Sequence, residues 1–99
     1  RAALLRHVRR DPLRGIAQIV RASHERWDGT GYPDRLAGHD IPLGARIVAV
    51  CDAYEAMTAD RPYRSALPAH VARVELVANA GTQFDPRVVD ELRRLLADN

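Results

Sequence analysis

The stretch from residue 28 to residue 41 limits the fold of this chain more than any other segment. It is polar, and it is broken by three glycines and one proline, which are Gly29, Gly31, Pro33 and Gly38. A segment interrupted this often forms neither a helix nor a strand. Loops longer than about a dozen residues in a compact domain usually carry function or are disordered. We therefore expect a long functional loop, with the regular elements on either side of it.

Apolar residues recur at helical spacing on both sides of this loop. Asp-Pro pairs at positions 11–12 and 85–86 are helix start signals, because an acidic N-cap is followed by proline at the first helical position. Pro42 and Pro68 open two further segments, and Gly81 is placed to close the second of them. The expected helices cover residues 1–10, Pro12 to about Trp27, Pro42 to about Met57, Pro68 to about Gly81, and Pro86 to the final leucines. The pattern predicts an all-α domain of about five helices.

The helix expected after Pro42 has the most regular apolar stripe, through Leu43, Ile47, Val50, Tyr54 and Met57. A stripe of this length favours a helix over a buried strand. The helix expected after Pro68 carries a similar stripe of Val71, Val74 and Val77.

Composition and charge exclude several classes of protein. At 99 residues, 46% of them hydrophobic and 28% charged, the chain fits one globular domain. A net charge of +2 with dispersed arginines gives no reason to expect a nucleic acid polymer as partner. The single cysteine, Cys51, excludes an internal disulfide and fits a cytoplasmic location. No apolar run approaches the roughly 20 residues of a membrane span, so we expect no membrane segment.

His24 and Asp28 are the first candidate site residues. At a spacing of four they would share one face of the second expected helix, where an imidazole and a carboxylate suit manganese, iron or zinc. Two ligands do not complete a site, since catalytic metals usually have at least three from the protein. The alternative is that His24 only interacts with the dipole at the helix C-terminus.

Asp52 and two arginines are the next candidates. Asp52 follows the most apolar run of the chain, so it is paired with an arginine such as Arg46, or is a ligand, or lies on the exposed face of its helix. Arg61 and Arg64 flank Pro62 in a break between helices. Two guanidinium groups suit a phosphate diester, although exposed loop arginines are often only solvated.

The segment SHERWDGTGYPDRLAGHDIPLGARIVAVCDAYEAMTADRPYRSALP closely resembles the C-terminal half of the HD-GYP domain, and GTQFDPRVV is typical of the tail of that family. The family comprises metal-dependent phosphodiesterases that hydrolyse bacterial cyclic di-GMP. The resemblance implies that His24 and Asp52 bind a divalent metal, iron or manganese, and that Arg61 and Arg64 hold the phosphates of the substrate. It also implies a loop near the active site or a partner surface, which contains Asp28, Gly29, Gly31, Tyr32 and Pro33.

The chain departs from the family pattern in two ways. The family usually has two adjacent histidines before the acid, and here Ser23 replaces the first. The His-Asp pair that gives the family its name is expected upstream of Pro12, but the only such dipeptide is His39-Asp40. We therefore expect residues 1–99 to be the C-terminal portion of an HD-GYP domain, short of metal ligands and inactive in isolation.

Two functions follow from this resemblance. In the first, the chain is part of a cyclic di-GMP phosphodiesterase that uses a metal-activated water. In the second, the chain is a degenerate, non-catalytic module that uses Tyr32 and Pro33 to contact a signalling partner such as a diguanylate cyclase domain. A bare helical fragment with no activity is a third reading. Self-association is also expected where an apolar stripe is left unburied.

Overall fold

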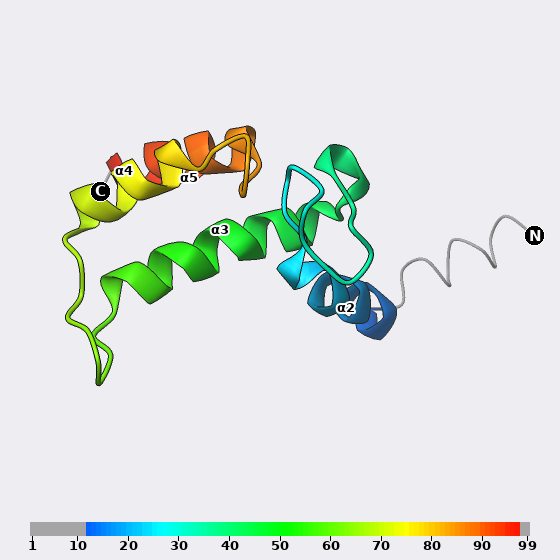
Figure 1. Cartoon of the computed structure of the whole chain (residues 1–99), viewed down its shortest axis with the longest axis horizontal. Helices are drawn as coiled ribbons and strands as arrows, with labels where there is room; N and C mark the ends of the chain where they lie inside the picture. Colours follow the sequence, from blue (N-terminus) through cyan, green and yellow to red (C-terminus); the bar gives the residue numbers. More distant parts are fainter. Residues whose placement is uncertain (1–11, 98–99) are drawn as a thin grey trace, which may run out of the picture.

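The computed structural model describes residues 12–97 and is all-helical (Figure 1). Its elements are α2 (Pro12–Arg21), η1 (Ala22–His24), η2 (Gly38–Asp40), α3 (Leu43–Thr58), α4 (Ala69–Ala78) and α5 (Pro86–Ala97). Between residues 12 and 97 the only β-type pairings are isolated bridges, Arg61 with Arg64 and Ala80 with Phe84. The all-α prediction is confirmed, while the helix expected at residues 1–10 lies outside the described residues.

The long helix α3 contacts α2, η1, α4 and α5. In Figure 1, α4 and α5 lie along one side of it, while α2 and the long loop lie at its N-terminal end. Pro42 precedes α3 in an extended conformation, as predicted for a helix start. At the other end the Thr58 hydroxyl donates to the Tyr54 carbonyl oxygen at 2.8 Å, and Ala59 is extended.

The main core joins α3, α4 and α5. Val50, Leu76, Phe84 and Val89 are buried together, with Tyr54, Met57 and Leu92 packed against them. Within the predicted α3 stripe, Val50 is therefore buried, and Tyr54 and Met57 are partly buried. At the start of the helix, Leu43 and Ile47 are 55% and 42% exposed, and they line an apolar groove of about 530 Å³ between α3 and α5.

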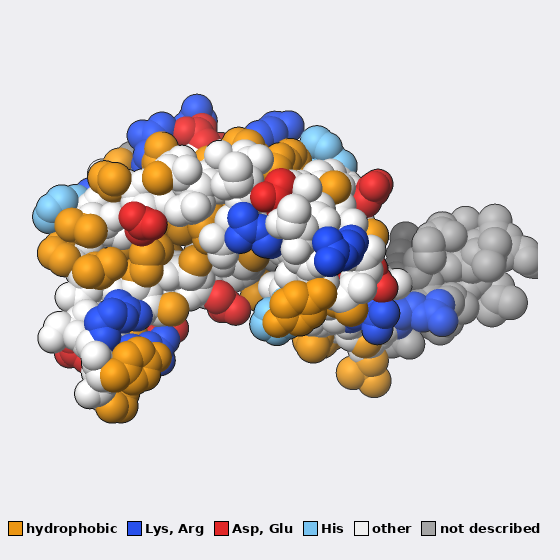
Figure 2. Space-filling model, viewed as in Figure 1, with side chains coloured by type: hydrophobic (Ala, Val, Ile, Leu, Met, Phe, Trp, Pro, Cys, Tyr) orange, Lys and Arg blue, Asp and Glu red, His pale blue; other side chains and the backbone are white. Residues whose placement is uncertain are grey.

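The valines of α4 do not form its packed face. Ala72 and Leu76 are buried, whereas Val71, Val74 and Val77 are exposed, and hydrophobic side chains cover this part of the surface in Figure 2. The helix is apolar on both faces, so the pattern could not select the side that packs. The leucine is the larger residue, and burying it contributes about 2 kcal/mol.

Gly81 does not close α4, contrary to the prediction. The helix ends at Ala78, and the amide of Asn79 donates to the carbonyl oxygens of Glu75 and Leu76 at 3.2 Å each. Gly81 has φ +90° and belongs to the next turn, where its amide donates to the Phe84 carbonyl oxygen at 2.8 Å. The positive φ explains why a glycine stands there.

A second, smaller core attaches α2 and the long loop to the start of α3. Ala22, Ile41 and Ala45 are buried together, with Ile19 and Leu36 packed against them. The expected second helix is shorter than predicted, because α2 ends at Arg21 and continues only as the 3-10 turn η1.

A half-buried ion pair links α3 to α5. The Arg46 guanidinium donates to the Asp85 carboxylate at 2.8 Å and to the Ile41 carbonyl oxygen at 2.9 Å. The second Asp85 oxygen accepts the Arg87 amide at 2.8 Å, which caps α5. Burial alone would raise the pKa of Asp85, but the hydrogen bonds from Arg46 and Arg87 outweigh it and hold the pKa below its ordinary value.

We predict that Asp85→Ala lowers the free energy of unfolding by about 3 to 5 kcal/mol, because it leaves the Arg46 charge half-buried without a partner. Urea denaturation measures this change.

The pKa of Asp85 is lower in the folded than in the unfolded chain, so its stabilising contribution is present above about pH 4 and is lost as the pH falls through the folded-state value. The stabilities of the wild type and Asp85→Asn should therefore converge in acid. A gap that stays constant down to pH 2 would contradict this account.

Candidate functional site

The long loop is held closed by a buried carboxylate. The chain leaves η1 at Glu25, whose backbone is extended and whose side chain is only 5% exposed. One Glu25 oxygen accepts the Asp34 amide at 2.7 Å and the other accepts the Leu36 amide at 2.8 Å. No role for Glu25 was predicted from the sequence, since an acid after a helix end gives no sign that it turns inward.

The returning loop packs directly on the residues that follow η1. A Cβ atom on Gly31 would lie 2.4 Å from the His24 carbonyl oxygen and 2.6 Å from the Arg26 nitrogen, so only glycine fits there. The next residue, Tyr32, donates its amide to the same carbonyl oxygen at 3.2 Å. Its ring stacks on the imidazole of His24, with centroids 5.0 Å apart and planes 11° from parallel. Both side chains remain exposed at the surface.

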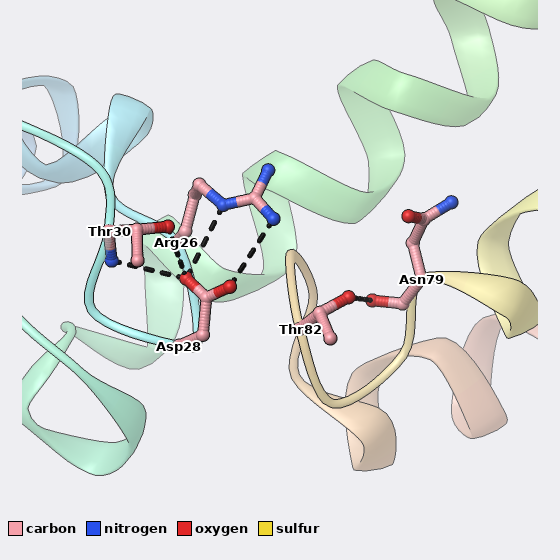
Figure 3. A network of polar contacts seen from close by, with 5 residues as sticks. All are labelled: Arg26, Asp28, Thr30, Asn79 and Thr82. Carbon is pink, nitrogen blue, oxygen red and sulfur yellow. Dashed lines mark hydrogen bonds and ion pairs between the residues drawn. The ribbon is translucent and has the colours of Figure 1, made fainter.

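Asp28 organises the turn before Gly31. Its carboxylate accepts the Thr30 hydroxyl at 2.6 Å and the Thr30 amide at 3.1 Å, and faces Arg26 at 3.4 Å (Figure 3). The Thr30 hydroxyl, followed by Arg26, lowers the pKa of Asp28 to about 2. The predicted shared helix face of His24 and Asp28 was wrong, because the helical turn ends at His24 and Glu25 is extended.

The long loop also meets the turn before α5. Trp27 donates its amide to the Gln83 carbonyl oxygen at 3.1 Å, and Asp28 donates its amide to that of Thr82 at 2.8 Å. Figure 3 shows the two turns facing each other, with the Thr82 hydroxyl bonded to the Asn79 carbonyl oxygen at 3.1 Å. At the far end of the loop, Arg21 binds the Asp34 carboxylate through two bonds of 2.9 Å, which lowers the pKa of Asp34.

Asp52 lies exposed in the middle of α3. Its carboxylate has no hydrogen bond or ion pair with any residue between 12 and 97, and Arg46 is bound to Asp85 instead. Of the three readings of Asp52, a buried pair with an arginine is therefore wrong. An exposed helix position and a ligand role are both compatible with this geometry.

Arg61 and Arg64 form a tight turn just beyond α3. Each donates its amide to the carbonyl oxygen of the other, at 2.8 and 3.1 Å. The Arg61 guanidinium reaches back to Glu55 at 3.2 Å, and that of Arg64 reaches the Ala56 carbonyl oxygen at 2.9 Å. These two anchor points follow Asp52 by three and four residues, so they lie on the same face of α3. The exposed pair with Glu55 is weak and leaves the guanidinium able to exchange partners.

The surface is hollowed beneath α3, between the loop after α3 and the loop after η1 (Figure 2). Arginine side chains (blue) lie on one edge of the hollow, an acidic side chain (red) lies at its top, and a histidine (pale blue) lies on the other edge.

His24 and Asp52 are residue types that bind divalent metals, but two ligands are fewer than a metal site needs. A histidine nitrogen and a carboxylate oxygen are suitable ligands for iron or manganese. Within residues 12–97, however, no group of three or more His, Cys, Asp or Glu side chains could hold a metal ion. The Ser23 hydroxyl donates to the Val20 carbonyl oxygen at 2.8 Å, and a serine hydroxyl is a weaker ligand for these metals than the histidine expected at this position.

An HD domain model matches residues 1–88 of the chain. The chain belongs to the HD domain family. It is 51% identical over 78 residues to a cyclic di-GMP phosphodiesterase response regulator of Xanthomonas campestris, covering 79% of this chain and 21% of that protein. It is 38% identical over 89 residues to 3'3'-cGAMP-specific phosphodiesterase 2 of Vibrio cholerae, covering 90% of this chain and 17% of that protein.

The fold is also found among solved HD domain structures. A cyclic GMP-AMP specific phosphodiesterase of Vibrio cholerae superposes with a TM-score of 0.73 at 26% identity, over 84% of this chain and 19% of that chain. The predicted resemblance to HD-GYP phosphodiesterases is confirmed. The chain spans about a fifth of the length of the relatives it matches. In its described part, no helix is both long and apolar enough to cross a membrane.

We predict that Gly31→Ala loosens the loop and destabilises the domain by about 1 to 3 kcal/mol, because its Cβ meets backbone atoms that cannot rotate away. Gly15→Ala in α2 is the matched control. Nothing lies within 4 Å of its added Cβ, so this variant should be more stable by about 0.5 to 1 kcal/mol. Thermal denaturation of both variants measures the effects. Equal melting temperatures would show that the loop does not press on residues 24–26.

Proposed function

We propose that residues 1–99 form the C-terminal portion of an HD-GYP domain in a metal-dependent phosphodiesterase that hydrolyses a cyclic dinucleotide. The family assignment supports this proposal, and relatives named for cyclic di-GMP and for 3'3'-cGAMP support a cyclic dinucleotide as the substrate. Within the chain, the observation that most supports the proposed function is the position of Asp52. It is an exposed carboxylate with no partner among residues 12–97, and it shares a helix face with the anchor points of Arg61 and Arg64.

In this proposal His24 and Asp52 are metal ligands, and the metal is iron or manganese. HD domain phosphodiesterases are generally metal-dependent. The chemistry that a divalent metal supplies when bound is activation of a water molecule and polarisation of the scissile phosphodiester. Because two ligands are too few, the other donors come from outside residues 12–97.

Arg61 and Arg64 bind the phosphates of the substrate. Their mutual main-chain bonds hold both side chains on one turn, and a guanidinium can donate two parallel hydrogen bonds to a phosphate. A cyclic dinucleotide carries two phosphodiesters, which suits a pair of arginines. We place the activity in the cytoplasm, where the free thiol of Cys51 would remain reduced.

One observation favours the alternative, a non-catalytic module that contacts a signalling partner such as a diguanylate cyclase domain. Ser23 stands where a second histidine is expected, and its hydroxyl is bonded to the carbonyl oxygen of Val20 in α2. Tyr32 is 61% exposed at the tip of the loop and offers an aromatic contact to such a partner.

We predict that His24→Ala and Asp52→Asn, made in the full-length protein, each lower bound metal and the rate of cyclic di-GMP or 3'3'-cGAMP hydrolysis together. The exposed Asp52 side chain has no hydrogen bond or ion pair with any residue between 12 and 97, so the melting temperature of Asp52→Asn should match that of the wild type. Elemental analysis, turnover and melting are measured on the same samples. Asp90→Asn on α5 is the control, because among residues 12–97 the ion pairs of this half-buried acid are with two arginines of its own helix.

This prediction separates the proposed functions. Full metal content and full activity in both variants would refute the ligand assignment. A wild-type protein that binds no metal and hydrolyses neither nucleotide would favour the interaction module.

We predict that Arg64→Ala raises KM for the cyclic dinucleotide about tenfold or more and leaves metal content unchanged. The loss of a bidentate charge-assisted contact to phosphate accounts for the change. Arg93→Ala is the matched control, since this arginine is exposed on α5 and pairs with Asp90. Steady-state kinetics distinguish the variants, and an unchanged KM in Arg64→Ala would exclude its role in binding substrate.

A further inference from the structure

Glu25 is unusual among the buried groups of the chain. In the described part, the buried polar or charged residues are Glu25 and Asp85. Asp85 is neutralised by Arg46, but the Glu25 carboxylate has no ion pair with any residue between 12 and 97. It is satisfied by two backbone amides, which lie nine and eleven residues further along the chain. A buried carboxylate is costly unless such hydrogen bonds satisfy it.

The two bonds fix the path of the returning loop. They hold residues 34 and 36 against the start of the same loop, so the segment between must fold back over residues 24–26. Gly31 is buried against that backbone, and the Tyr32 amide reaches the His24 carbonyl oxygen at 3.2 Å. The Tyr32 ring is thereby laid parallel to the His24 imidazole.

We propose that Glu25 is a positioning residue for the metal ligand His24, and that it acts by closing the loop so that Tyr32 fixes the plane of the imidazole. This inference rests on the proposed function of His24. The side chain next in sequence to the ligand points away into the loop, and the loop in turn holds the ligand's ring. Partners that orient a metal-binding histidine typically change metal affinity by about 10 to 100-fold when they are removed.

The test is Mn²⁺ binding to the full-length protein, measured by calorimetry well below the melting temperature. We expect Glu25→Ala to weaken Mn²⁺ affinity by about tenfold or more. Glu25→Gln should fall between Glu25→Ala and the wild type. Its amide oxygen can accept one of the two backbone amides, while its NH₂ group faces the other.

A double-variant experiment tests whether Glu25 acts through Tyr32. A purely structural role of Glu25 would not couple the effects of the two substitutions on Mn²⁺ affinity. Tyr32→Ala should weaken Mn²⁺ affinity as well, and the double variant with Glu25→Ala should lose less than the product of the two single effects. Independent effects, or an unchanged affinity in Tyr32→Ala, would overturn the proposed route. A lower melting temperature in Glu25→Ala with wild-type affinity would overturn the positioning role.

Two further variants complete the design. Asp34→Asn removes the exposed pair with Arg21 but keeps the backbone amide that Glu25 binds, so its affinity should stay within twofold of the wild type. A tenfold loss in this control would attribute the effect to general loosening of the loop and refute the proposal. His24→Ala tests the function itself. If it leaves Mn²⁺ affinity unchanged, the ligand assignment fails, whereas a loss in His24→Ala without a loss in Glu25→Ala refutes only the inference about Glu25.

Discussion

The half-buried guanidinium of Arg46 is the junction on which the rest of the structure depends. It joins three places that are distant in sequence: the end of the long loop at Ile41, the first turns of α3, and the start of α5 at Asp85. The two loops that lead into these points bond to each other through Trp27 and Asp28. Because one cation serves both contacts, the position of the loop relative to α3 is tied to the packing of α5. Loss of the Arg46 guanidinium would therefore release two contacts at once, one to the end of the long loop and one to the start of α5.

Helix starts were predictable from the sequence because proline acts locally. Helices begin at or directly after Pro12, Pro42, Pro68 and Pro86, as expected from the fixed φ of proline and its missing amide hydrogen. The packed face of α4 was not predictable, since valines and the Ala72–Leu76 pair offer two apolar faces. Leu76 packs with Val50, which lies on α3, and with Phe84, which precedes α5. Both partners lie outside α4, so the sequence of α4 alone does not select its packed face.

The candidate site shows the same limit. The residue types at His24, Asp52, Arg61 and Arg64 indicated metal and phosphate binding. The family resemblance then assigned one of these roles to each residue. The sequence could not show that Asp28 would bind Thr30 rather than share a face with His24, because that depends on the chain leaving its helix at Glu25. Nor could it reveal Glu25 itself, whose partners are main-chain amides that every residue except proline possesses.

The contact between the long loop and the turn before α5 makes the chain's one tryptophan a natural probe. Trp27 donates its amide to Gln83, accepts the Gly38 amide at 2.9 Å, and meets the His39 ring edge-on at 5.2 Å. Indole emission responds to the polarity around the ring and to quenching by a neighbouring imidazole. Intrinsic tryptophan fluorescence therefore reports on the contact between the long loop and the turn before α5. It needs no label, and no other indole in the chain contributes to the signal.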